Sequence, residues 1–160
     1  MVKRAIADEL KMTRPFRSRA QEAGLALLRT AHLLRRRVEA VVANEEITLQ
    51  QYNVLRILRG APGPLPTMEI SDRMIETSCG ITRLITTLEQ KDLVRREPWP
   101  GDRRQILCQI TPAGLRILAR LEDAVNSADA SLLTGLSGRQ IDALLDILAE
   151  IRSTAEASPE

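Results

Sequence analysis

The feature of this chain that most constrains its fold is a change of hydrophobic period close to residue 92. Before this point, apolar residues recur at helical spacing and form one apolar face, at Ile81, Leu84, Ile85 and Leu88. After it, residues 94–99 and 105–110 read as two short strands, and Pro-Gly-Asp-Arg-Arg at 100–104 predicts a turn with a basic tip. A helix followed directly by a β-hairpin is therefore the expected centre of the fold.

Helical patterns flank this unit on both sides. Residues 1–19 form a basic leader, broken at Pro15, that we expect to be partly disordered. Further helices are expected at about 17–43, from Thr48 to Gly60, from Thr67 to a break at 76–78, from Thr111 to about 133, and from Ser137 to 151. Thr48 with Gln51 has capping-box spacing, and a Thr-Pro pair at 111–112 is typical of a helix start.

Composition excludes several classes of function. The 160 residues include one His, two Cys and only 2% aromatic residues. We expect no metal site, no cofactor and no enzymatic activity, since zinc sites and His-dependent catalysis need more such side chains. Scarce aromatics also argue against recognition of nucleic acid by base stacking. No targeting segment or membrane-length apolar run is present, so a cytoplasmic protein with reduced thiols is expected, with Cys108 in the core.

The net charge of +2 hides an uneven distribution. Residues 1–40 hold ten Lys and Arg against four acids, residues 73–104 hold seven against five, and residues 113–160 hold four against eight. Solvated helix faces produce such asymmetry, and so does a surface that binds a polyanion. Combined with the helix–hairpin unit, the pattern favours one side that faces DNA and one that does not.

The order of these elements predicts a mainly α fold with a small β-hairpin wing, a winged helix-turn-helix. An α-helix fits the major groove of DNA, where polar side chains reach base edges. On the helix that Ser78 can cap and that is expected to end at 91–92, the candidate DNA-binding residues are Ser78, Cys79, Thr82, Arg83 and Thr86. Arg103 and Arg104 at the hairpin tip are placed to reach the adjacent minor groove, whose negative potential attracts guanidinium groups.

Two stretches resemble the MarR (multiple antibiotic resistance regulator) family of bacterial transcription factors. Residues 79–96, CGITRLITTLEQKDLVRR, are similar to its recognition helix and the start of its wing. Residues 102–118, DRRQILCQITPAGLRIL, are similar to its signature, carried here by Asp102, Arg104, Ile110, Thr111 and Gly114. The chain departs from the family pattern at Asp92, where Gly is common, and at Gly80, where Ser or Thr is common. A left-handed residue is expected at position 92, where the helix ends, and Asp tolerates that conformation better than most residues.

The resemblance implies a division of the chain. Residues 46–111 would form the winged helix-turn-helix domain, and residues 20–45 and 112–155 would form N- and C-terminal dimerisation helices around it. The homodimer would bind a pseudo-palindromic operator in double-stranded DNA, with the two recognition helices roughly 34–36 Å apart.

The resemblance also implies roles for single residues. Thr82 and Arg83 match the family's Thr-Arg pair in the recognition helix. Arg104 would enter the minor groove, and Asp102 would hold it by a charge-assisted hydrogen bond. Arg103 would touch phosphate or point into solvent.

A small-molecule pocket is a further implication of the resemblance, between the dimerisation helices and the winged domain. It often takes anionic aromatic effectors, and the candidate residues here are Arg29, His32 and Arg36. The expected function is a repressor relieved by such a ligand, because repression needs only binding in the right place. Two alternatives stay open: a redox-responsive regulator that senses through Cys79, and a dimerisation module that does not bind DNA.

Overall fold

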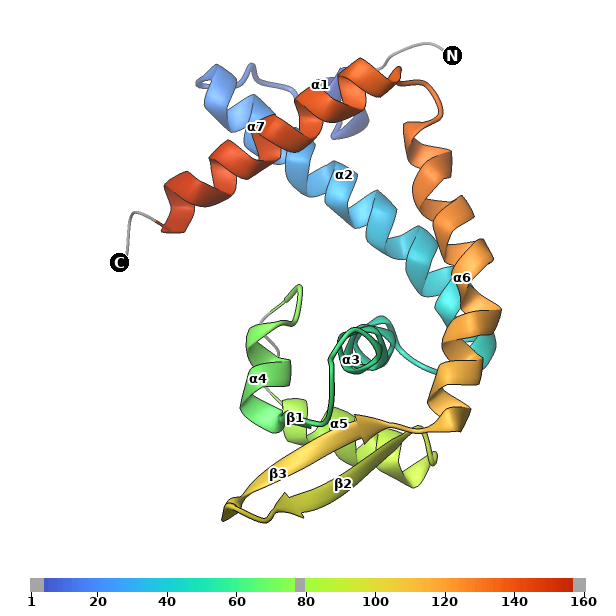
Figure 1. Ribbon diagram of the computed structural model, residues 1–160. Coiled ribbons are helices and arrows are strands. Elements are labelled where there is room, and N and C mark those ends of the chain that lie inside the picture. Colours follow the sequence, from blue (N-terminus) through green and yellow to red (C-terminus); the bar gives the residue numbers. More distant parts are fainter. Residues whose placement is uncertain (1–4, 77–79, 157–160) are drawn as a thin grey trace.

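The structure is a computed structural model that describes residues 5–76 and 80–156, apart from the side chains of residues 103, 104 and 156. Its elements in chain order are α1 (Ile6–Glu9), α2 (Arg19–Val42), the 3-10 helix η1 (Ala43–Glu45), α3 (Leu49–Arg59), β1 (Leu65–Pro66), α4 (Thr67–Asp72), α5 (Ile81–Gln90), β2 (Val94–Trp99), β3 (Asp102–Ile110), α6 (Pro112–Leu133) and α7 (Gly138–Glu156). This is the mainly helical fold with a hairpin wing that the sequence predicts (Figure 1).

Capping side chains fix where two of these helices begin. At α3, the Gln51 N–H donates to the Thr48 hydroxyl at 3.2 Å, and the Thr48 N–H donates to the Gln51 side-chain oxygen at 3.0 Å. At α6, the Thr111 hydroxyl accepts from the Gly114 N–H at 3.1 Å, and a proline occupies the first helical position. Both expected helix starts are confirmed, because each is set by contacts within four residues.

The sheet has the strand order β1-β3-β2 and is antiparallel throughout. Val94 pairs with Ile110 and Trp99 pairs with Asp102, with a register irregularity between Pro98 and Trp99. Two details differ from the sequence expectation. The strand β1 was not expected, because it is two residues long and lies in a Pro-rich loop. The strand β3 begins at residue 102 rather than 105, because pairing with β2 extends it to the turn.

The buried core joins the sheet to the surrounding helices. Its fully buried side chains come from α2, α3, α4, α5, both long strands and α6, and are Val42, Val54, Leu55, Ile70, Ile85, Leu88, Val94, Cys108 and Leu118. Cys108 therefore lies in the core, as expected. Burial raises the pKa of the Cys108 thiol, so this sulfur stays protonated near neutral pH.

The long helices α2 and α6 pack against each other above the sheet, and α7 lies at the far end of the molecule from the wing (Figure 1). The short helix α1 packs on α2, so residues 6–9 are ordered where a loose leader was expected. Along α7, several large apolar side chains are exposed, among them Leu145, Ile147 and Ile151. None of the helices in the described part of the chain is both long and apolar enough to cross a bilayer.

Candidate nucleic-acid interface

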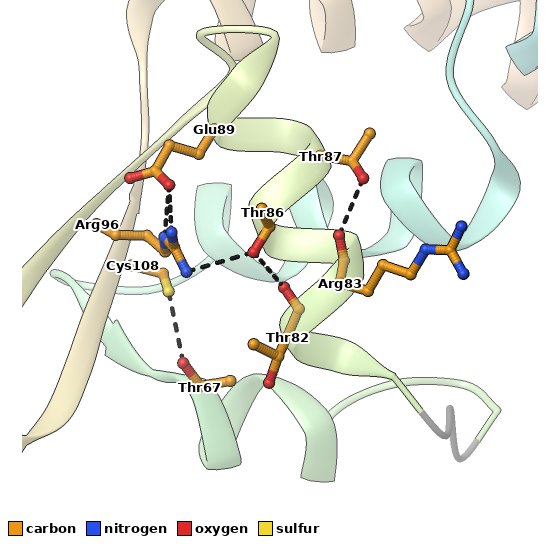
Figure 2. A network of polar contacts seen from close by, with 8 residues as sticks. All are labelled: Thr67, Thr82, Arg83, Thr86, Thr87, Glu89, Arg96 and Cys108. Atoms are coloured by element: carbon orange, nitrogen blue, oxygen red, sulfur yellow. Dashed lines mark hydrogen bonds and ion pairs between the residues drawn. The ribbon is translucent and has the colours of Figure 1, made fainter.

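The helix α5 has one buried face and one exposed face. Ile85 and Leu88 are fully buried against the core, which fixes the rotation of the helix about its axis. That rotation leaves Thr82 and Arg83 exposed, and the Arg83 side chain extends from the α5 ribbon on the side opposite Arg96 and Glu89 (Figure 2). The helix begins after Gly80, whose φ of 119° is accessible to glycine but rarely to other residues.

Thr86 lies at the edge of the exposed face and differs from its neighbours. Its hydroxyl donates to the Thr82 carbonyl oxygen at 2.8 Å and accepts a long hydrogen bond of 3.4 Å from Arg96 (Figure 2). The side chain is half-buried, so its hydroxyl is already committed to the protein. The sequence expectation grouped it with Thr82 and Arg83, but only those two are exposed.

Arg96 of β2 ties the wing to α5. Its Nε lies 2.7 Å and its Nη2 lies 2.5 Å from the same oxygen of Glu89, near the end of α5 (Figure 2). The hydrogen bond to Glu89 raises the pKa of Arg96, so the guanidinium keeps its charge. The sequence analysis missed this pair. A signal existed, because strand alternation puts Arg96 on the same face as buried Val94.

The C-terminal end of α5 is closed by a left-handed residue. Asp92 has φ of 57°, as expected for this position. The Leu93 N–H donates to the Leu88 carbonyl and the Asp92 N–H donates to the Glu89 carbonyl, both at 2.9 Å. These two bonds form the Schellman motif, which turns the chain sharply from α5 into β2.

The same corner is joined to the start of α6. The Thr111 hydroxyl donates to the Asp92 carbonyl at 2.6 Å, and the Thr111 N–H donates to the Leu93 carbonyl at 3.1 Å. At Gly114, a Cβ would lie only 2.5 Å from the Leu93 carbonyl oxygen, so the backbones approach as closely as glycine allows. The Thr-x-x-Gly motif thus fixes α5 to the long helix α6.

At the tip of the wing, Pro100 and Gly101 form the turn between β2 and β3. The aromatic ring of Trp99 covers Gly101, where a Cβ would lie 3.2 Å from a ring carbon. Asp102 is half-buried, and residues 103 and 104 follow it in β3. The side chains of those two arginines, and all of Ser78 and Cys79, lie outside the described residues, so their expected roles remain predictions.

A cavity of about 550 Å³ lies between α2, α3, α6 and the segment that follows α4. Its apolar lining includes Leu34, Val38, Leu49, Met74, Ile75 and Val125. Its polar and aromatic lining consists of His32, Arg35, Gln50, Tyr52, Asn53, Arg56, Glu76 and Asp129. Of the three residues expected in an effector pocket, His32 is the one found here.

The other two candidates lie elsewhere. Arg29 lines a separate cavity of about 420 Å³ between α1 and α2, where its Nε is 3.6 Å from a carboxylate oxygen of Glu9. Arg36 lines neither cavity within the described part of the chain. The sequence analysis missed Arg35, although its spacing of three residues from His32 puts both on one face of α2.

These features define a winged helix-turn-helix protein. The helices α3 and α4 precede α5, α5 has an exposed polar face, and the hairpin is fixed against α5. Comparisons with known proteins agree and are more specific. The model of the MarR family matches residues 47–106. A MarR transcription factor from Planctomyces limnophilus is 34% identical, with 84% of this chain and 98% of that chain covered and a TM-score of 0.65. The chain therefore belongs to the MarR family of transcriptional regulators.

Two further solved structures share the fold. The MepR–DNA complex from S. aureus is 20% identical, covers 81% of this chain and 96% of that chain, and has a TM-score of 0.74. The Bordetella bronchiseptica regulator BpsR is 19% identical, covers 87% of this chain and 98% of that chain, and has a TM-score of 0.76. The BpsR structure addresses regulation of its DNA binding by 6-hydroxynicotinic acid.

Proposed function

We propose that this regulator is a homodimeric repressor that binds a pseudo-palindromic operator and is released by a small ligand. The observation that carries the proposal is the exposed pair Thr82 and Arg83 on α5. Buried residues fix the rotation of this helix about its axis. The helix begins after Gly80, and its C-terminal end leads into the wing. A rigid polar helix face of this kind is suited to base readout in the major groove, where arginine pairs with guanine.

Each predicted contact residue has a place in this proposal. Arg83 reads a base, Thr82 contacts a base or phosphate, and Ser78 and Cys79, which precede α5 in the sequence, add contacts to the DNA. Thr86 contributes less, since its hydroxyl is bonded within the protein. At the wing, Arg104 enters the minor groove with Asp102 supporting it, and Arg103 contacts phosphate.

Dimerisation through α2, α6 and α7 accounts for the exposed apolar residues at that end of the molecule. The exposed large apolar residues at that end include Leu27, Leu28, Leu33, Leu34, Leu136, Leu145, Ile147 and Ile151. Leaving such a surface in water is unfavourable, and burying it against a second copy removes that cost. A two-fold dimer also explains the expected palindromic operator, because each copy reads one half-site.

Release by a ligand is supported by the 550 Å³ cavity, whose size is typical of small-molecule sites. BpsR, a neighbour by fold, supplies a precedent for control of DNA binding by an aromatic acid. The proposal assigns DNA binding and no catalytic step or cofactor to the chain, and it places the protein in the cytoplasm with the DNA it regulates.

The test is a binding titration with a labelled fragment of the promoter upstream of the protein's own gene. We expect specific binding that weakens steeply between about 50 and 200 mM salt, because several phosphate-bound counterions are released. Arg104→Ala should weaken binding to all sequences, whereas Arg83→Ala should also relax base preference. Failure to bind that fragment at low salt would favour a dimerisation module without DNA binding.

A further inference from the structure

The turn at the tip of the wing has a backbone that two-residue hairpins rarely use. Pro100 and Gly101 are the two residues that join β2 to β3. The turn types that suit such a hairpin need a positive φ at the first of these positions, which proline cannot adopt. Neither Pro100 nor Gly101 has a positive φ. The backbone of this turn therefore does not by itself match the twist of the two strands.

The strand pairing beside this turn is interrupted. Trp99 pairs with Asp102 across the turn, and the next pair joins Pro98 to Ile106. Between these two pairs β3 has three residues, 103–105, whereas β2 has none. A bulge of this kind bends its strand and changes the direction in which its residues point. Two of the three residues are arginines, so the backbone of the bulge decides where they stand relative to DNA.

The indole ring of Trp99 lies against the turn. A Cβ on Gly101 would lie 3.2, 3.3 and 3.5 Å from three carbon atoms of the six-membered ring, so the ring covers the glycine backbone closely. An aromatic ring over a glycine stabilises a sheet at a position that has no side chain of its own. Trp99 is 42% exposed and is not one of the residues of the buried core. Its packing therefore acts locally, on the tip of the wing.

We propose that Trp99 is a positioning residue for DNA binding: its ring holds Gly101, and with it the turn and the bulge at 103–105, in the conformation that meets the operator. A tip that is ordered before binding loses less conformational entropy on the DNA, so the affinity is higher. The indole acts through the backbone of the turn and carries no charge. This inference rests on the proposed function and adds an uncharged residue on which the contribution of the wing depends.

The first experiment compares Trp99→Ala with Trp99→Phe in operator binding, measured by fluorescence anisotropy over a series of salt concentrations. We expect Trp99→Ala to raise the dissociation constant about threefold to tenfold, the range of such an ordering cost. Its salt dependence should also be shallower, because a loosened tip gives up phosphate contacts. Trp99→Phe keeps a ring over the turn and should stay close to wild type. No loss in Trp99→Ala would overturn the positioning role, and so would a loss with unchanged salt dependence, which would make the indole itself a DNA contact.

A second set of variants tests the contact between ring and glycine. Because Gly101 has no positive φ, alanine fits its backbone, but the added Cβ presses on the Trp99 ring. Gly101→Ala should therefore weaken operator binding when Trp99 is present and change it little when combined with Trp99→Ala. Additive losses in the double variant would overturn the contact as the cause.

NMR of the free protein reports the same contact without DNA. The ring current of Trp99 should move an Hα resonance of Gly101 upfield of its position in Trp99→Ala, because the ring lies against this residue. An unshifted resonance would overturn the contact. A shifted resonance in a wild-type protein that binds no operator would instead contradict the proposed function, and the role of Trp99 in DNA binding would fail with it while the contact stands.

Discussion

The two ends of this molecule bury their apolar residues in different ways. The winged half, from α3 to β3, encloses Leu55, Ile85 and Leu88 completely within one chain. In the helical half, formed by α2, α6 and α7, Leu28 is 68% exposed and Leu145 is 59% exposed. The winged half thus forms a closed core within one copy, although it also exposes Met68 and Ile75. In the helical half, by contrast, no apolar side chain of the described part of α7 is buried, and a second copy would cover that surface.

The most direct way to sharpen this comparison is to remove a buried side chain from the winged half. We expect Leu55→Ala to lower the free energy of unfolding by about 2–5 kcal/mol, because it leaves a cavity in a closely packed core. Urea unfolding measures this loss. The matched control in the same half is Met68→Ala on α4, where the side chain is 70% exposed and the loss should be below about 0.5 kcal/mol. Similar losses for both would contradict the packing described for this half.

In the helical half, the corresponding variant is Leu145→Ala on α7. We expect it to weaken dimerisation by about 1.5–3 kcal/mol, the contribution of a leucine that passes from water into an interface. Sedimentation equilibrium reports the dimer dissociation constant, and Asp146→Ala on the same helix is the control that removes no apolar side chain. An unchanged dimer constant for Leu145→Ala would place this residue outside the interface.

Within the winged half, Arg96 and Arg95 are adjacent but differ in their partners. Arg96 bonds Glu89 of α5, whereas Arg95 is 71% exposed and pairs with Glu97 on its own strand. We expect Arg96→Ala to cost about 1 kcal/mol of stability and to weaken DNA binding, because the wing loses its tie to the recognition helix. Arg95→Ala should change stability little. Thermal unfolding and operator titration on both variants separate the two, and equal effects would remove the positioning role of Arg96.

The smallest expected effect concerns the joint between the halves. Arg120 of α6 forms a two-point contact with Glu45 of η1, with distances of 2.8 and 2.5 Å. The hydrogen bonds from Arg120 lower the pKa of Glu45 below its usual value of 4.5. A carboxylate whose pKa is lowered by folding stabilises the fold at pH values above its pKa in the unfolded chain. This contribution is lost as the pH falls through its pKa in the folded protein.

The stability difference between wild type and Glu45→Gln should therefore shrink as the pH falls below about 4.5. Chemical unfolding of both proteins at a series of pH values measures it. A difference that stays constant over this range would show that Glu45 titrates alike in the folded and unfolded chains.

Local chemistry explains which parts of the structure could be predicted from the sequence. The helix starts at Thr48 and Thr111 and the left-handed Asp92 depend on contacts within a few residues, and all three were predicted. The exposed face of α5 followed from the spacing of its apolar residues.

Features that depend on distant parts of the chain were missed. The strand β1 exists only because Leu65 pairs with Cys108, more than forty residues away. The Arg35–Glu76 pair joins residues 41 positions apart, and no local pattern predicts which distant carboxylate Arg35 meets. The expected pocket residues Arg29 and Arg36 were chosen for charge on α2, but the packing of α3 and α6 decides which face of α2 lines the cavity.

In the proposed complex, two copies of α5 read DNA together, each through Arg83. The most direct test is selection of bound sequences from random DNA by the wild-type protein and by Arg83→Ala. We predict an inverted repeat with half-sites about 10–10.5 base pairs apart, and loss of preference at one symmetric pair of positions in the variant. Enriched sequences without two-fold symmetry, or an unchanged preference in Arg83→Ala, would contradict the claim.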